Sequence, residues 1–175
     1  MIRFKLKIGD IFTIPLSEKE VGFGQIVCFP NSKNAFIMCV FDIKQSKETP
    51  IEIQKICNTP LLFLGYSTDA KLYHKHWEII GNSIKNIDSI TMPYFRLGTP
   101  PKDIYLINYK GDRLKSINIK EFDMLDYETN YAPIRYENAL KAHFGFGEWI
   151  PENYNNLLYK FTLDSNEIAK RILNK

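Results

Sequence analysis

The sequence predicts an α+β protein that is mostly β, with an antiparallel sheet or partly open barrel and two helices in the C-terminal third. Short apolar and β-branched runs recur along the first two thirds of the chain, and polar or glycine-containing turns separate them. Extended helical periodicity appears only in the last third. A length of 175 residues favours one domain over residues 1–175. Prolines and glycines over residues 83–101 mark the place where a subdomain seam is expected.

Seven runs have the character of strands. The run at 60–66 is almost wholly apolar, which is typical of a strand buried on both faces. The last two runs flank Lys110-Gly111-Asp112 and are predicted to form a hairpin. The first three form an antiparallel meander, because turn residues such as Pro30-Asn31-Ser32 separate them. The runs cover residues 11–16, 22–29, 35–43, 60–66, 77–81, 103–109 and 113–119.

Two helices are expected near the C-terminus. The first begins at Pro133, because the N–H that proline lacks has no partner in the first turn of a helix, and it ends before Gly145. The second is predicted from Asp164, which with Glu167 resembles a capping box. Apolar residues at helical spacing define one face of each helix: Tyr136, Ala139 and Leu140, then Ile168, Ala169, Ile172 and Leu173.

The composition excludes several classes of protein. A net charge of +3 is too mild for a strongly basic nucleic-acid binder or a strongly acidic nucleic-acid mimic. Three cysteines without paired spacing argue against a disulfide framework and favour reduced thiols in the cytosol. No apolar run approaches the roughly 18 residues of a membrane span. We therefore expect a cytoplasmic protein without a membrane partner.

The chain shows no constellation typical of catalysis or of cofactor binding. It has no Gly-x-Ser-x-Gly elbow, and Gly22-Phe23-Gly24 lacks the Lys-Ser/Thr ending of a phosphate loop. His74 and His76 would share one face of a strand, but a structural zinc site needs four ligands at readable spacing. We predict a protein that is not an enzyme, with no cofactor and no metal.

An acidic stretch and a loop tryptophan are the candidate contact residues. Residues 120–137 hold five acids against Lys120 and Arg135. Such a stretch is either a solvated loop or a docking surface for a basic partner, where complementary charge speeds association. Trp149 lies in a loop with glycine and proline, where it either packs against the barrel end or anchors an interface. The predicted contact residues are Glu121, Asp123, Asp126, Glu128 and Trp149.

Several ordered segments resemble the immunity protein 26 family of bacterial polymorphic toxin systems. They are Lys7-x-Gly9-Asp10-x-Phe12-x-Ile14-Pro15-Leu16, Gly22-Phe23-Gly24, Trp77-x-Ile79-Ile80-Gly81 and the later Tyr136-Glu137-Asn138-Ala139-Leu140. No single motif is specific, and the ordered set carries the resemblance, which covers most of the chain. It implies a mostly β fold and a cognate toxin encoded by an adjacent gene, as in contact-dependent inhibition. The family supplies no catalytic residues.

The sequence thus leads to one main hypothesis and one alternative. The main hypothesis is a cytoplasmic immunity protein that neutralises a cognate toxin by direct stoichiometric binding, with no nucleic-acid partner. The alternative is a single-stranded nucleic-acid-binding β-barrel module, because aromatic side chains on short strands can stack bases.

Overall fold

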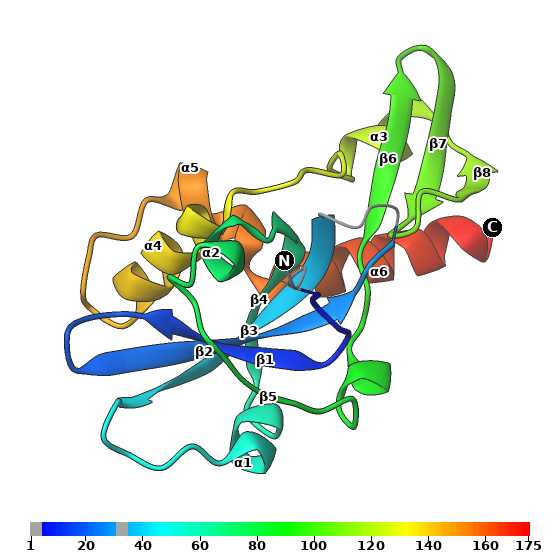
Figure 1. Cartoon of the computed structure of the whole chain (residues 1–175). Helices are drawn as coiled ribbons and strands as arrows, with labels where there is room; N and C mark the ends of the chain where they lie inside the picture. The colour runs from blue at the N-terminus through cyan, green and yellow to red at the C-terminus, as the bar shows by residue number, and fades with distance from the viewer. Residues whose placement is uncertain (1–4, 31–34) are drawn as a thin grey trace. The chain divides into compact units, whose positions relative to one another are not determined.

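The chain forms two compact units in the computed structural model, which describes residues 5–30 and 35–175 (Figure 1). Unit 1 comprises the chain up to Ile90 together with Asn130–Leu158. Unit 2 comprises Thr91–Thr129 and Tyr159–Lys175. Each unit therefore combines segments that are distant in the sequence. One domain over residues 1–175, with a seam in 83–101, stays a prediction.

Unit 1 is built on a five-stranded antiparallel sheet with the order β4-β3-β2-β1-β5. The register places Phe12, Gly24, Val40 and Phe63 side by side across four strands. This pairing confirms the predicted N-terminal meander, whereas Asn31 and Ser32 of the predicted turn lie outside the described residues. The strands are β1 (Asp10–Pro15), β2 (Glu20–Cys28), β3 (Ala35–Ser46), β4 (Leu61–Thr68) and β5 (Ile79–Asn82).

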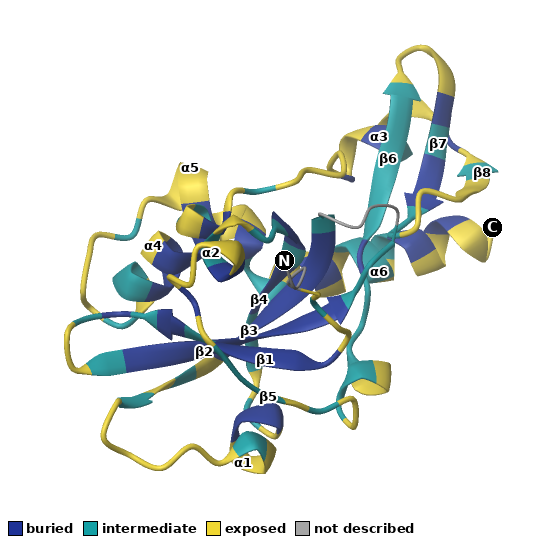
Figure 2. Cartoon of the chain, viewed as in Figure 1, coloured by how far each residue is buried: buried dark blue, intermediate teal, exposed yellow. Residues whose placement is uncertain are grey.

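Both faces of this sheet are covered at its centre. One face packs beneath helix α4 (Pro133–His143), where Tyr136 and Leu140 join a buried cluster with Phe12 and Val40. On β3, the residues on either side of Val40, Cys39 and Phe41, are also fully buried. In Figure 2, β2 is accordingly dark along most of its length and β3 is dark in its first half. Burial on both sides explains why the sequence of β3 is apolar at consecutive positions.

Two glycines of β2 allow close packing of large side chains on the covered face. A Cβ on Gly22 would lie 2.5 Å from Leu140 Cδ2, and one on Gly24 would lie 2.5 Å from Phe12 Cε2. Glycine in a strand costs stability unless another group approaches closely. Here the close approach lets an aromatic ring and a helix sit directly on the strand.

Unit 2 is a three-stranded antiparallel sheet with two helices on one face. The order is β6-β7-β8, and α3 (Ile119–Asp123) and α6 (Tyr159–Leu173) pack over it. Its core joins Leu106 of β7 to Phe122 and Ile172 of the two helices. The predicted hairpin is confirmed as β7 (Lys102–Asn108) and β8 (Arg113–Ser116). None of the seven predicted runs lies in 83–101, but β6 (Tyr94–Thr99) forms there and pairs with β7.

The predicted fold class is confirmed. Within the described residues the two sheets are open, and the two longest helices, α4 and α6, lie in the C-terminal third. Besides α3, the shorter helices are α1 (Ile53–Cys57), α2 (Ala70–Tyr73), α5 (Pro151–Tyr154) and the 3₁₀ turns Ile87–Ser89 and Asn155–Leu157. In the described parts of the chain, none of the helices is long and apolar enough to span a membrane.

The two long helices differ in how well the sequence predicts their starts. α4 begins at Pro133, as predicted, with Ala132 as the N-cap residue. α6 begins at Tyr159, so the predicted start at Asp164 is wrong. The reason is tertiary, because the Tyr159 hydroxyl accepts a hydrogen bond from the Thr91 N–H at 2.9 Å and Thr162 is buried. These contacts stabilise an extra turn that the local pattern does not reveal.

Candidate functional site

The predicted contact residues fall in both units. Glu121 and Asp123 belong to α3, and Asp126 and Glu128 follow in the same unit. Trp149 belongs to unit 1, in the loop between α4 and α5. We call residues 121–128 the acidic segment. The acidic segment and Trp149 are therefore two candidate surfaces, one in each unit.

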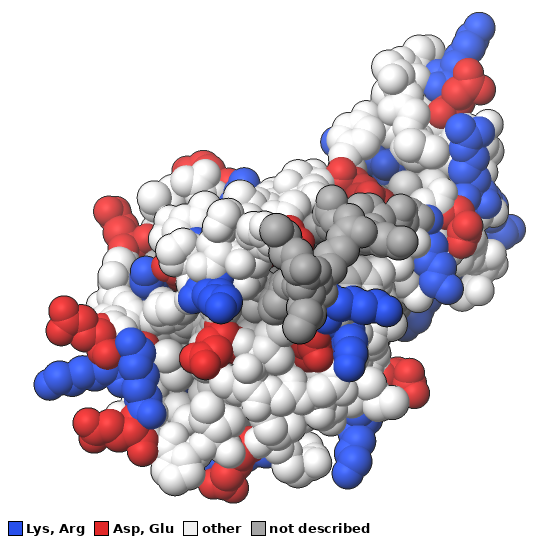
Figure 3. Space-filling view, in the orientation of Figure 1, with Lys and Arg blue, Asp and Glu red and all other residues white. Residues whose placement is uncertain are grey.

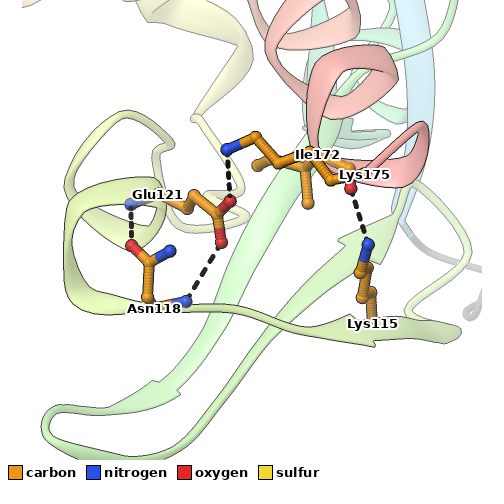
Figure 4. Close-up of polar contacts among 5 residues, drawn as sticks. All are labelled: Lys115, Asn118, Glu121, Ile172 and Lys175. Carbon is orange, nitrogen blue, oxygen red and sulfur yellow. Dashed lines mark hydrogen bonds and ion pairs between the residues drawn. The ribbon is translucent and has the colours of Figure 1, made fainter.

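Glu121 is engaged within unit 2. Its Oε2 accepts from the Asn118 N–H at 3.1 Å, and Asn118 Oδ1 accepts from the Glu121 N–H at 3.0 Å, which makes a capping box (Figure 4). Its Oε1 lies 2.9 Å from Lys175 Nζ. The bond from Lys175, and then the one from Asn118, holds the pKa of the carboxyl below its ordinary value. Glu121 thus fixes the start of α3 and connects it to the residues after α6.

A second contact in Figure 4 holds the end of α6. Lys115 of β8 donates from Nζ to the Ile172 carbonyl at 2.8 Å. A cation at the last carbonyls of a helix satisfies an acceptor and complements the helix dipole. This contact joins β8 to the end of α6, and the Glu121–Lys175 ion pair joins α3 to the residues after α6.

The rest of the acidic segment presents charge together with apolar surface. The Asp123 side chain is 68% exposed, and Asp126 and Glu128 are also exposed. Two large apolar residues of the segment, Met124 and Tyr127, are exposed to 52% and 45%. Exposed methionine and tyrosine are enriched at protein interfaces, and acidic residues are more typical of the rim. The composition therefore fits a docking surface for a basic partner.

Charge by itself does not single out this surface. On the face that Figure 3 presents, basic and acidic side chains of the described residues are interspersed. The acidic segment combines exposed carboxylates with exposed apolar side chains. Sequence reasoning identified the carboxylates and missed the exposed apolar side chains of Met124 and Tyr127.

Sequence reasoning also missed Arg96, which contacts the acidic segment. Its main-chain N–H donates to the Asp126 carbonyl at 2.9 Å, and its Nη1 donates to the Phe122 carbonyl at 3.2 Å. The same Nη1 lies 4.0 Å from Asp123 Oδ1. Arg96 stands alone as a charged residue in the run Tyr94–Leu97, which was the signal available.

Trp149 packs at the edge of the core of unit 1. Its ring stacks on Phe63 at a centroid distance of 6.4 Å and meets the edge of Tyr154 at 5.4 Å. Its Nε1 donates to Asn155 Oδ1 at 3.0 Å. The side chain is half-buried, so its packing role is plain from the geometry, and its role as a contact residue stays a prediction. The next residue, Ile150, is 38% exposed.

Glu137 differs from the other acids with which the sequence grouped it. It is buried on α4, where Oε2 accepts from Trp77 Nε1 at 3.0 Å and pairs with Lys71 Nζ at 3.1 Å. Oε1 pairs with Lys141 Nζ at 2.7 Å. Burial raises the pKa of this carboxyl, but the three hydrogen bonds outweigh burial and the net pKa is lowered. Glu137 belongs to the interior, and the interpretation of 120–137 as one surface stretch is wrong at this residue.

The cysteines and histidines are the residues from which a nucleophilic or metal site would be built. Burial raises the pKa of the Cys39 thiol far above its ordinary value, so Cys39 is not a thiolate nucleophile. Cys28, Cys39 and Cys57, all of them described, form no disulfide with one another. In the part of the chain that the structure describes, no three His, Cys, Asp or Glu residues are placed to hold a metal ion. His74 and His76 are exposed, with ring centroids 6.3 Å apart.

A family model described as immunity protein 26 matches residues 7–100, just over half of the chain. The chain belongs to the immunity protein 26 family. Membership implies an immunity protein that acts against a toxin. None of the curated proteins and none of the solved structures that were compared matches the chain. The matched range covers the five-stranded sheet and β6, including Arg96, whereas the acidic segment and Trp149 lie outside it.

The motif residues of this immunity protein hold its fold together. Asp10 is buried, and its carboxylate accepts from the Lys7 N–H at 2.8 Å and from Asn82 Nδ2 at 2.9 Å. Phe12 stacks on Trp77 with centroids 5.1 Å apart and planes 6° apart. Asp10, Phe12 and Trp77, three residues of the motif set, are therefore structural.

Proposed function

We propose that this chain is a cytoplasmic immunity protein that neutralises its cognate toxin by direct, stoichiometric binding and without catalysis. The observation that carries the proposal is the match to the immunity protein 26 family over residues 7–100. The three cysteines form no disulfide with one another, which is in keeping with a reducing compartment. The partner is the toxin domain encoded by an adjacent gene.

The acidic segment is the proposed contact surface for a basic face of the toxin. Asp123, Asp126 and Glu128 supply the negative charge, and Met124 and Tyr127 supply apolar contact area. Glu121 takes part mainly by fixing α3, because its carboxylate already binds Lys175. Trp149 is proposed as a second contact, from unit 1.

The experiment that tests the function is co-expression of this chain with the product of the adjacent gene. Protection of the cells, together with co-purification of a one-to-one complex, is the expected result. Protection without a complex would point to an enzyme that reverses the damage. If the adjacent product is toxic and this chain neither protects nor binds, the proposed function is wrong.

The contact surface has its own prediction. The triple variant Asp123→Asn, Asp126→Asn and Glu128→Gln is expected to lower the association rate with the toxin about tenfold at low salt, because steering by complementary charge is lost. The measurement is stopped-flow or surface-based kinetics at several salt concentrations. The difference from wild type should shrink as salt screens the charges.

A second triple variant controls for net charge. Glu18→Gln, Glu48→Gln and Glu52→Gln removes the same number of charges from exposed positions of unit 1. Association should stay near the wild-type rate. If both variants slowed association with the toxin equally, the net charge of the protein would be the cause. The assignment of the acidic segment as the contact surface would then be wrong.

The nucleic-acid alternative is tested in the same preparation. Several aromatic rings of unit 1 pack against one another, as in the pairs Phe12–Trp77 and Phe63–Trp149, which leaves them unsuited to stack bases. Titration with a single-stranded oligonucleotide at about 50 mM salt, where electrostatic binding is strong, should give a flat response. Salt-sensitive binding would instead favour the alternative.

A further inference from the structure

Arg96 lies between two aromatic rings of the acidic segment. Its guanidinium carbon is 4.6 Å from the Phe122 ring centroid and 4.5 Å from the Tyr127 ring centroid. The two rings meet edge to face, with centroids 5.8 Å apart. The Tyr127 hydroxyl in turn donates to the Gly98 carbonyl at 3.0 Å, on the same strand as Arg96. The side chain is therefore held by residues near both ends of the segment.

The hydrogen bonds of Arg96 also reach the segment near both ends. Its main chain binds the Asp126 carbonyl, and its Nη1 binds the Phe122 carbonyl and lies near Asp123. A parallel bridge pairs Arg96 with Tyr127. The carboxylates of Asp123 and Asp126 thus project from a backbone that is fastened at Phe122 and again at Asp126.

The contact needs arginine in particular. The planar guanidinium stacks on both rings while one nitrogen donates to a carbonyl, and a lysine ammonium cannot do both. Arg96 Nε is buried and has no hydrogen-bond partner among the described groups. Aromatic stacking and the Nη1 bond hold the side chain in place.

We infer that Arg96 is a positioning residue of the toxin-binding surface, which orders the acidic segment before the toxin arrives. The inference rests on the proposed function and deepens it. A segment that is already ordered loses less conformational entropy on binding, so the complex is tighter. The positive charge of Arg96 repels a basic partner. Arg96 therefore favours toxin binding by ordering the acidic segment and not through its charge.

The test compares Arg96→Lys with Arg113→Lys. Both variants keep the charge and remove a guanidinium that lies over an aromatic ring, since Arg113 of β8 lies 4.8 Å from the Tyr105 ring centroid. The probe is the inactivated toxin domain of the adjacent gene. Affinity and association rate are measured against salt, and hydrogen exchange of residues 121–128 is measured in the free protein.

Arg96→Lys is expected to weaken toxin binding about tenfold, as expected for loss of roughly 1.4 kcal/mol of preorganisation. Exchange across 121–128 should speed up. The salt dependence of association should match wild type, because no charge has changed. Arg113→Lys should bind like wild type.

Three results would overturn the inference, and each identifies a different failure. Faster exchange with unchanged affinity would make Arg96 a residue of the fold alone. Equal weakening by Arg113→Lys would show a general effect of unit 2. If the acidic triple variant binds like wild type, the surface itself is misassigned. Failure of wild type to bind and protect would instead remove the proposed function.

Discussion

Glu137→Ala is expected to lower the free energy of unfolding by about 3 kcal/mol. The change removes the acceptor of the buried Trp77 indole N–H and leaves Lys71 and Lys141 without their shared counter-charge. A buried donor without a partner retains its desolvation cost. The two lysines are partly exposed and can recover water, so most of the loss falls on the Trp77 bond and on packing. Urea unfolding followed by tryptophan fluorescence measures it.

The Glu137 result has two controls. Glu148→Ala removes an exposed acid of the same unit and should leave stability within about 0.5 kcal/mol of wild type. Glu137→Gln keeps an acceptor for Trp77 and loses the charge, so it should fall between wild type and alanine. A loss equal to that of Glu148→Ala would show that the Glu137 contacts contribute nothing measurable.

The Glu137 carboxyl is also expected to make the free energy of unfolding depend on pH in acid. The pKa of Glu137 in the folded chain lies below its ordinary value, so folding favours the ionised form. Its stabilisation is complete above the unfolded pKa and is lost as the pH falls through the folded pKa. The stability of Glu137→Gln should therefore change less steeply than that of wild type below about pH 4.5, near the unfolded pKa of a glutamate.

Gly24→Ala is expected to cost about 3 kcal/mol of stability. The new methyl carbon would lie 2.5 Å from the Phe12 ring and 3.2 Å from the Cys39 carbonyl oxygen. Phe12 cannot move away freely, because it stacks on Trp77. The backbone of β3 is fixed by its pairing with β2 and β4. Thermal or urea unfolding measures the loss.

Gly147→Ala is the matched control for this change. A Cβ on Gly147 would meet its nearest atoms at 3.8 Å, an ordinary contact distance. Stability should stay close to wild type or rise slightly, since alanine restricts the unfolded chain. Equal stability of the two variants would mean that the sheet adjusts at Gly24 without cost.

The acidic stretch shows how far sequence reasoning reached on the candidate site. Five acids within residues 120–137 looked alike in the sequence. In the structure Glu137 is a buried partner of Trp77, Glu121 caps α3, and Asp123 is exposed beside Arg96. Trp77 and Arg96 are far from these acids along the chain, and no local pattern connects them.

The secondary structure shows the same division between local and distant causes. Pro133 and the hairpin around Gly111 were predictable, because proline chemistry and a glycine turn act within a few residues. β6 was not, because its arginine and the nearby prolines obscure strand character until β7 pairs with it. The start of α6 depends on a bond from Thr91, which lies far from Tyr159 in the sequence.

The sequence by itself determined the fold class, the meander of the first three strands, the two long C-terminal helices and membership of an immunity-protein family. Alternation, turn chemistry and an ordered motif set are properties of the sequence, and they can be recognised without knowing any tertiary contact. The tertiary structure alone decided which acids are interior, which fix a helix and which face solvent beside Met124 and Tyr127. The physical reason is that the environment of a charge is set by partners distant in the chain.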